Sequence, residues 1–176
     1  QMKELGIGKE ILINSFSYYI GLGENAISYL HNIKQPSLNI SLVHYRIYFP
    51  NIPINYYNTL SLIEDYDVRD YAEYIKSYFF NSNDYNPIDD IKSMLAINKY
   101  TYTDYILLYA RLLYPTYYFD LFSQYINMDN YDENKIINIL NKQNSYELFL
   151  KDCYYEIKNK YNIPEISWII KRSNKL

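Results

Sequence analysis

The residues best suited to chemistry lie between positions 42 and 80. His44 ends a short apolar run, and a second apolar run ends at Glu64 and Asp65. Asn51 lies in the Pro/Asn-rich loop between the two runs. Phosphoryl-transfer enzymes place polar groups just after short strands in this way, because their catalysis consists mainly of positioning and of charge neutralisation. The pattern therefore makes phosphoryl transfer the first hypothesis to weigh.

Short strands and helices must position these side chains. Residues 38–44 alternate and are rich in branched side chains, which predicts a strand, and residues 59–63 predict a second one. The apolar positions of residues 68–80 trace one helical stripe, with Asp67 as the expected N-cap. Trp168 is expected to anchor the C-terminus in the core. Residues 9–31 predict one helix or a pair of helices, interrupted at Gly21 and Gly23. Further helices are predicted over residues 88–97, 103–114, 117–126, 133–142 and 145–160.

The composition is that of one globular domain. The chain has 176 residues, of which 49% are hydrophobic and 21% charged, and this length suffices for a real core. The net charge of −3 gives no general attraction to nucleic acid, and no apolar run approaches the roughly 18 residues of a membrane span. We therefore predict a single, mainly α domain over residues 1–176, with a small two-stranded β element near residues 39–63.

Cysteine and histidine are too scarce for several kinds of site. Cys153 is the only cysteine, which excludes an internal disulfide and a cysteine metal cluster and favours a reducing, intracellular compartment. His31 and His44 alone are too few for a zinc site. The 25 tyrosines fit the codon usage of an A/T-rich genome, and a sticky or cross-linkable tyrosine surface is the alternative.

Residues 44–51, HYRIYFPN, resemble the catalytic loop of the aminoglycoside/choline phosphotransferase-like kinases, written H-G-D-x-x-x-x-N. His44 matches the histidine, Arg46 stands where the aspartate belongs, and Asn51 follows at the right spacing. Residues 63–67, IEDYD, resemble the strand end that carries the metal-binding aspartate of these kinases. Within these two segments, each catalytic position except the proton acceptor therefore has a counterpart of suitable type, whereas the chain has no Gly-rich phosphate loop and no strand lysine.

The segments around this loop extend the resemblance. Residues 68–75 resemble the helix that follows the metal-binding aspartate, where an Asp-x-Ala segment packs back under the site. Four segments resemble the spore-coat branch of these kinase-like proteins in low-GC Firmicutes: GLGENAISYL (21–30), DVRDYAEYIKSYFF (67–80), YARLLYPTYYFDLF (109–122) and IPEISWI (163–169). The resemblance implies the C-terminal, mainly helical lobe of a kinase-like fold. It further implies a fragment of a longer chain, with a nucleotide-binding lobe upstream of Gln1.

The resemblance also assigns chemical roles. In such kinases an aspartate accepts the substrate proton, while an asparagine and a second aspartate hold Mg²⁺. Arg46 cannot accept a proton, because its guanidinium stays protonated, and we expect it to pair with Asp65 at the metal position. Asn51 and Asp65 have the ligand types that Mg²⁺ prefers but make a weak site. Whether Glu64 or Asp65 occupies the metal position is left open.

Structural roles are the simpler interpretation for several of these residues. His44 is expected to be a hydrogen-bonded histidine that holds the loop. Asp65, Asp67 and Asp70 are expected to cap a helix and to form a buried pair with Arg69, and we take Arg69 and Asp70 as that structural pair. Under this interpretation none of these side chains needs a metal.

These observations predict a catalytically degenerate kinase-like protein that is a structural or interaction component, deposited in the bacterial spore coat. It is expected to bind protein partners and to need no cofactor as this chain alone. Two alternatives stay open. With an upstream lobe, the parent chain would use Mg²⁺ and ATP to phosphorylate a small hydroxyl substrate. Otherwise the chain is an all-helical interaction protein of an A/T-rich virus or parasite.

Overall fold

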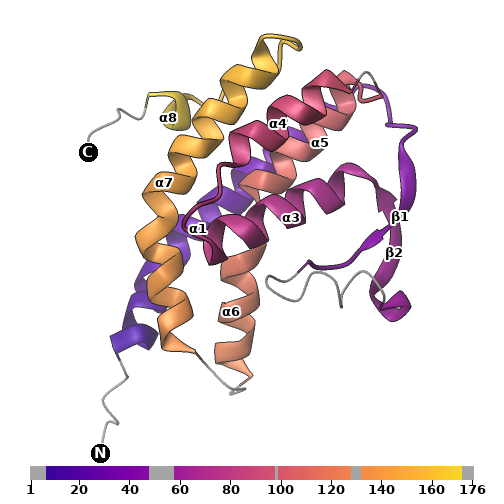
Figure 1. The fold of residues 1–176 in the computed structure, drawn as a ribbon. Helices are drawn as coiled ribbons and strands as arrows, with labels where there is room; N and C mark the ends of the chain where they lie inside the picture. The colour runs from indigo at the N-terminus through magenta and orange to yellow at the C-terminus, as the bar shows by residue number, and fades with distance from the viewer. Residues whose placement is uncertain (1–6, 48–57, 98, 128–131, 172–176) are drawn as a thin grey trace, which may run out of the picture.

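The computed structural model describes residues 7–47, 58–97, 99–127 and 132–171. Within these ranges the fold is mainly helical, with one two-stranded sheet at its edge (Figure 1). The helices are α1 (Ile7–Leu30), α3 (Val68–Asn81), α4 (Pro87–Ala96), α5 (Tyr102–Leu113), α6 (Thr116–Ile126), α7 (Glu133–Lys158) and α8 (Ser167–Ile170). The sheet elements are β1 (Ile40–His44), the 3₁₀ turn η1 (Thr59–Ser61) and β2 (Leu62–Tyr66).

The β1–β2 hairpin is antiparallel, with Val43 opposite Ile63 and Ser41 opposite Asp65. A small β element is thus confirmed, but the predicted bounds 59–63 of its second strand are wrong. The first residues of that range form η1 instead, because the side chain of the preceding asparagine accepts a backbone N–H and caps a turn. The strand therefore begins later and contains Asp65, rather than ending before it.

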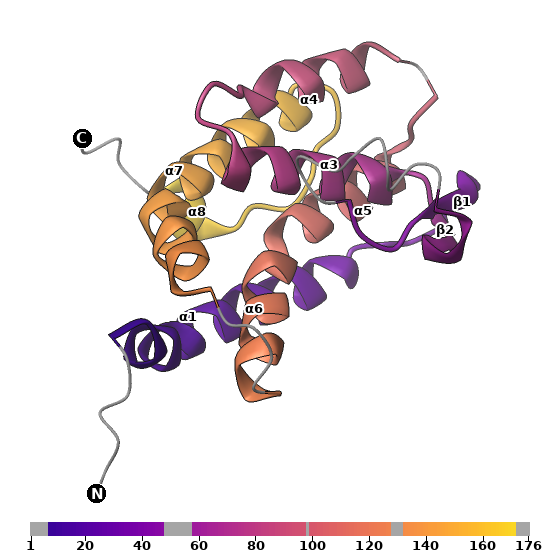
Figure 2. The same cartoon turned by 60° about the horizontal axis from the view of Figure 1, so that its bottom comes forward.

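Helix α5 lies at the centre of the fold, between α1 and α3 (Figure 2). Ten of its 12 residues are buried, because most of them are apolar and other helices pack around them. A capping box fixes its start, in which Asp104 accepts the backbone N–H of Thr101 at 2.7 Å. The core forms around α5, where α1, α3 and α7 pack against it.

Tyrosines supply much of this core. Six of the largest fully buried side chains are tyrosines, namely Tyr19, Tyr105, Tyr109, Tyr118, Tyr146 and Tyr154. Several hydroxyls donate to helix carbonyls: Tyr109 to Leu150 at 3.0 Å and Tyr146 to Leu112 at 2.8 Å. Burial raises the pKa of both of these phenols well above its usual value. A large ring with a polar tip can therefore be buried without leaving its hydroxyl unpaired.

Two neighbouring helices that the sequence predicts near the C-terminal end form a single helix in the structure. Residues 133–142 and 145–160 belong to the continuous helix α7. The junction contains neither proline nor glycine, and Gln143 is buried there, where its Oε1 accepts the hydroxyl of Tyr19 at 3.0 Å. The predicted break was wrong because polar residues inside a helix do not end it when a tertiary partner satisfies them.

The expectation for Trp168 is also wrong. Its side chain is 38% exposed, whereas Ile163, Ile166 and Ile169 are buried in the core. Helix α8 is only four residues long, and it presents its isoleucines rather than the tryptophan to α7. Small branched side chains therefore anchor this end of the described chain.

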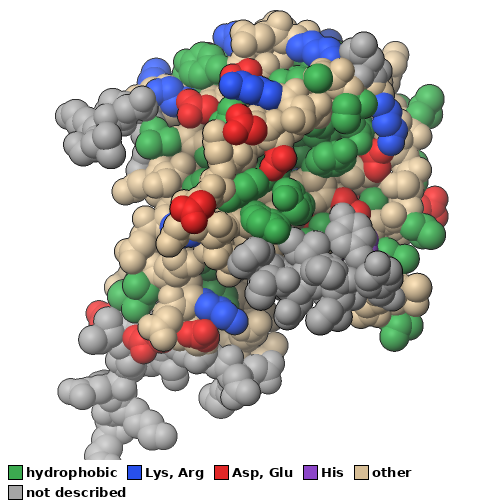
Figure 3. All heavy atoms as spheres, viewed as in Figure 1, with side chains coloured by type: hydrophobic (Ala, Val, Ile, Leu, Met, Phe, Trp, Pro, Cys, Tyr) green, Lys and Arg blue, Asp and Glu red, His purple; other side chains and the backbone are tan. Residues whose placement is uncertain are grey.

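The outer surface of the hairpin and its flanking residues carries exposed apolar side chains. Figure 3 shows hydrophobic side chains projecting at the edge where β1 and β2 lie, and Leu38, Leu42 and Leu60 are 93%, 71% and 95% exposed. The core therefore does not bury this edge, and polar contacts contribute much of its attachment to the body. No helix within the described ranges is long and apolar enough to cross a bilayer.

Candidate functional site

His44 ends β1 and is fixed to α3. Its backbone N–H donates to Asp70 Oδ1 at 2.8 Å, and its ring Nδ1 lies 3.0 Å from Asp70 Oδ2. The residue is only 5% exposed. Asp70 lies in the first turn of α3, so the Asp-x-Ala segment lies directly beneath the end of the strand. This geometry is that of a histidine that positions a loop.

Asp65, the candidate metal ligand on β2, faces two arginines. Arg69 Nη1 donates to Oδ2 at 2.7 Å, and Arg111 Nη2 donates to Oδ1 at 2.8 Å and to Oδ2 at 2.6 Å. The backbone N–H of Tyr66 adds a bond of 2.7 Å to Oδ1. Burial alone would raise the pKa of Asp65, but the hydrogen bonds from Arg69, Tyr66 and Arg111 lower it. Protein donors therefore occupy both carboxylate oxygens.

Glu64 points to the other face of the hairpin. Neighbouring strand residues project to opposite faces, and Glu64 is exposed opposite Leu42. Of the two acidic residues that the sequence left as candidates, only Asp65 faces the body of the protein.

The pair expected between Arg69 and Asp70 is replaced by two other contacts. Arg69 binds Asp65, and its Nε and Nη2 donate to the carbonyls of His44 and Tyr45 at 3.1 and 2.9 Å. Adjacent residues on a helix project in different directions. Asp70 therefore reaches the histidine while Arg69 reaches the strand and the residues that follow it.

Arg46 does not pair with Asp65, contrary to expectation. Its Nε donates to Asp120 Oδ2 on α6 at 3.1 Å and lies 3.9 Å from Glu73 Oε2 on α3. Burial works against the charge of Arg46, but the hydrogen bond to Asp120 and the charge of Glu73 outweigh it and raise the pKa. Because two other arginines already surround Asp65, Arg46 finds its partners on α3 and α6.

A buried ion pair that the sequence analysis missed lies next to Arg46. Lys76 Nζ donates to Glu73 Oε1 and to Thr116 Oγ1, each at 2.8 Å. Glu73 and Lys76 are 5% and 3% exposed. Burial lowers the pKa of Lys76, whereas attraction from Lys76 and Arg46 overcomes burial and lowers the pKa of Glu73. Their i, i+3 spacing on one helix was the available sequence signal.

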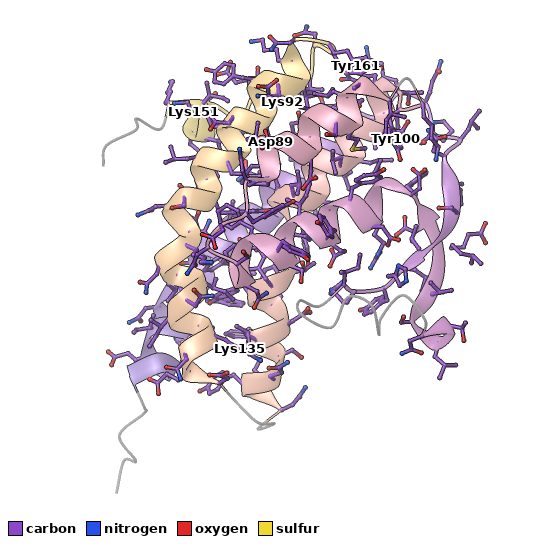
Figure 4. The ribbon with its side chains drawn as sticks, viewed as in Figure 1. Asp89, Lys92, Tyr100, Lys135, Lys151 and Tyr161 are labelled. Atoms are coloured by element: carbon purple, nitrogen blue, oxygen red, sulfur yellow. The ribbon has the colours of Figure 1, made fainter. Side chains whose placement is uncertain are left out.

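Two hollows flank this charged cluster. One of about 360 Å³ lies between α3 and α6 and reaches Lys135, which Figure 4 shows at the start of α7. The other, of about 490 Å³, lies between α1, α5 and the residues that follow β1. Arg46, Glu73, Lys76 and Thr116 line both hollows. The charged cluster thus forms a partition between two concave surfaces.

The described residues do not fit a magnesium site. Asn51 lies outside them. No group of three or more His, Cys, Asp or Glu side chains in the described ranges is arranged to hold a metal ion, and guanidinium groups cover both oxygens of Asp65. Cys153 is fully buried in α7, where burial raises the pKa of its thiol.

Replacing Asp70 by Ala is expected to lower the free energy of unfolding by about 1–3 kcal/mol, because the buried His44 loses its two hydrogen bonds to Asp70. Urea unfolding measures this loss. Asp89→Ala is the matched control, since Asp89 is an exposed first-turn residue of α4 (Figure 4) and its loss is expected to be about 0.5 kcal/mol. Equal losses for the two variants would show that Asp70 does not hold the hairpin.

Comparisons with known proteins identify the family of this chain. Residues 6–153 match the family described as "Spore coat putative kinase YutH". The chain is 29% identical to the endospore coat-associated protein YutH of Bacillus subtilis (strain 168) over 93% of its own length and 53% of the relative's. It therefore spans about half the length of the curated relative that it matches. No solved structure gave a significant match. The match to most of the chain shows that it belongs to the YutH family of spore coat kinase-like proteins.

Proposed function

We propose that this chain is part of a catalytically degenerate kinase-like protein that acts in the spore coat as a structural or interaction component. The observation that carries the proposal is the double arginine contact on Asp65. A carboxylate whose oxygens already accept from two guanidinium groups and a backbone N–H has little remaining capacity for Mg²⁺. The metal on which phosphoryl transfer depends would have to displace both arginines.

Arg46 supports the same proposal. It stands at the motif position of the proton-accepting aspartate, and a guanidinium has no lone pair with which to accept a proton. Asp120 and Glu73 stabilise its charged form further. Both the acceptor and the metal position are thus dominated by positive charge. The spore coat assignment comes from the family and the relative, whose names both include that location.

An active phosphotransferase is the alternative, and one observation favours it. The chain covers only 53% of its relative, so a protein of the relative's length has room for a second lobe that could bind nucleotide. In that protein, Asp65 would have to exchange Arg69 and Arg111 for a metal ion. The two proposals therefore differ in whether Mg²⁺ and ATP bind.

The test is a thermal unfolding titration of the intact parent protein with Mg²⁺ alone, ATP alone and both together. A ligand at a hundred times its dissociation constant adds about 2.7 kcal/mol to the stability of the native state. We expect no rise in the unfolding temperature that requires both Mg²⁺ and ATP. We also expect no transfer of radiolabelled phosphate to small alcohols or to protein. A Mg²⁺-dependent shift with ATP, or any such transfer, would refute the proposal and establish the alternative.

Replacing Asp65 by Asn separates the two proposals in a second way. If Asp65 is structural, the free energy of unfolding of the variant falls by about 1.5–3 kcal/mol, because the charge-assisted hydrogen bonds from Arg69 and Arg111 weaken. Since the folded-state pKa of Asp65 is lowered, its stabilisation is present above the unfolded pKa of about 3.9 and is lost as the pH falls. The difference between variant and parent should therefore shrink on acidification, as urea unfolding at several pH values would show.

Asp84→Asn is the control for this variant, because Asp84 is exposed between α3 and α4. This substitution should change the free energy of unfolding by no more than about 0.5 kcal/mol at every pH. A phosphotransferase activity that the parent has and Asp65→Asn lacks would favour the enzyme instead.

A further inference from the structure

Three of the chain's four arginines converge on one hollow. Among its 17 basic residues only four are arginines, and Arg46, Arg69 and Arg111 all line the space of about 490 Å³ between α1 and α5. They come from three separate segments: the residues after β1, helix α3 and helix α5. A planar guanidinium matches carboxylate and phosphate groups in a way that lysine does not. Their convergence therefore indicates a binding role beyond general surface charge.

The acidic partners do not neutralise this cluster. Arg69 and Arg111 share the single carboxylate of Asp65, which leaves one positive charge in excess. Arg46 is balanced by Asp120. The remaining cation and anion of the lining, Lys76 and Glu73, pair with each other. One added negative charge in the hollow would neutralise the charge of the cluster.

Hydrogen-bond donors also remain on two of the arginines. Arg69 directs Nε, Nη1 and Nη2 to acceptors of the protein. Arg111 donates through Nη2, and its buried Nε has no acceptor within the described ranges. Arg46 donates through Nε and Nη1. The side chains of Arg111 and Arg46 are 25% and 16% exposed. An acceptor in the hollow can therefore reach their guanidinium groups and add charge-assisted hydrogen bonds.

One part of the wall of the hollow is apolar. It consists of Ala26, Ile27 and Leu30 of α1 and of Leu107 and Ala110 of α5. Ile27 and Leu30 are 56% and 39% exposed, so apolar surface lies open beside the arginines. A ligand that fits must therefore have two parts, an acidic group and an apolar body.

We propose that this hollow binds an organic anion, a carboxylate or a phosphate monoester with an apolar body, through Arg111 and Arg46 and without a metal ion. The apolar body lies against α1 and α5. This inference rests on the proposed function, because Arg111, one of the two arginines that cover Asp65, also binds the anion. It goes further by naming the ligand class and by assigning the cluster a role other than filling a vacant metal position.

The experiment uses the intact parent protein in EDTA with four probes. Phenyl phosphate and benzoate have both an acidic group and an apolar body, whereas inorganic phosphate has only the acid and benzyl alcohol only the body. Binding is followed through the Nε–Hε nuclear magnetic resonance signals of the arginines. This chain contributes four of them, and substitution of Arg46 and of Arg111 assigns the two signals of interest. We expect saturable shifts of the Arg111 and Arg46 signals with at least one two-part probe. Inorganic phosphate and benzyl alcohol should bind more weakly, and the preferred acid distinguishes phosphate from carboxylate.

Three variants test the named residues. Arg111→Gln should weaken binding roughly tenfold or more, the equivalent of losing one charge-assisted hydrogen bond. Ile27→Asp should weaken it comparably by placing a like charge on the apolar wall, and because Ile27 is exposed this variant keeps the fold. Lys92→Gln is the control, since Lys92 lies on α4 beside Glu156 of α7, away from the hollow (Figure 4), and should bind as the parent does.

Each outcome is decisive. Metal-free binding that Arg111→Gln and Ile27→Asp weaken, and that Lys92→Gln does not, supports the inference. If no probe binds, or if all three variants bind as the parent does, the inference is overturned while the proposed function stands. Binding that appears only after Mg²⁺ is added overturns both.

Discussion

Replacing Glu73 by Gln is expected to lower the free energy of unfolding by about 3–5 kcal/mol, since it leaves a buried ammonium group without its carboxylate. Lys76 is 3% exposed, and the other partner that its Nζ has is the hydroxyl of Thr116. The variant also removes one of the two carboxylates near Arg46. Chemical denaturation followed by circular dichroism measures the loss, and a loss below about 1 kcal/mol would show that water screens this pair.

The double variant Glu73→Gln/Lys76→Met identifies the cause of the loss. Removing both charges should restore much of the stability, because a buried ion pair can often be replaced by side chains of similar volume at little cost. If the double variant is instead as unstable as the single one, the damage comes from packing rather than from an unpaired charge. The Glu73–Lys76 pair would then stabilise the fold through its packing rather than through its charges.

Replacing Tyr109 by Ala is expected to cost about 3–5 kcal/mol, the range for removing a large aromatic side chain from a packed core. Tyr109 is 0% exposed on α5, its ring lies 5.2 Å from that of Tyr29 on α1, and its hydroxyl donates to Leu150 on α7. One side chain thus connects three helices. Denaturant unfolding measures the loss, and a change of less than about 1 kcal/mol would mean that the surrounding side chains collapse into the space.

Two further substitutions serve as references for this result. Tyr109→Phe keeps the ring and removes only the hydroxyl, so about 1 kcal/mol is expected. Tyr155→Ala removes a tyrosine that is 44% exposed on the same helix as Leu150, and about 0.5 kcal/mol or less is expected. The series separates burial of the ring from the hydrogen bond of its hydroxyl.

The helices of this protein were largely predictable because their apolar positions repeat with the helical period. The predicted stripe over residues 68–80 corresponds closely to α3, Val68–Asn81, and the interrupting glycines near position 22 do not break α1, which continues to Leu30. The local sequence pattern predicted the wrong helix bounds where tertiary contacts determine them. Gln143 continues α7 because Tyr19 donates to its side chain, a contact between residues far apart in sequence.

The site was less predictable than the fold. Sequence motifs identified Asp65 and Arg46 as the residues of interest, but not their partners. Arg111 lies 46 positions from Asp65, and Asp120 lies 74 from Arg46. Nothing in a local pattern specifies which of several carboxylates a guanidinium reaches, because the packing of α5 and α6 against α3 and the hairpin determines it. The arginine cluster is therefore a property of the fold, and the sequence showed only its separate members.

The position of Trp168 determines what intrinsic fluorescence can report. It is the single tryptophan of the chain, and it lies partly exposed on a four-residue helix rather than in the core. Its emission will follow detachment of the C-terminal segment from α7, while the buried tyrosines around α5 report on the core. Unfolding curves that disagree between the two signals would therefore reveal separate detachment of α8, an event that either signal alone would conceal.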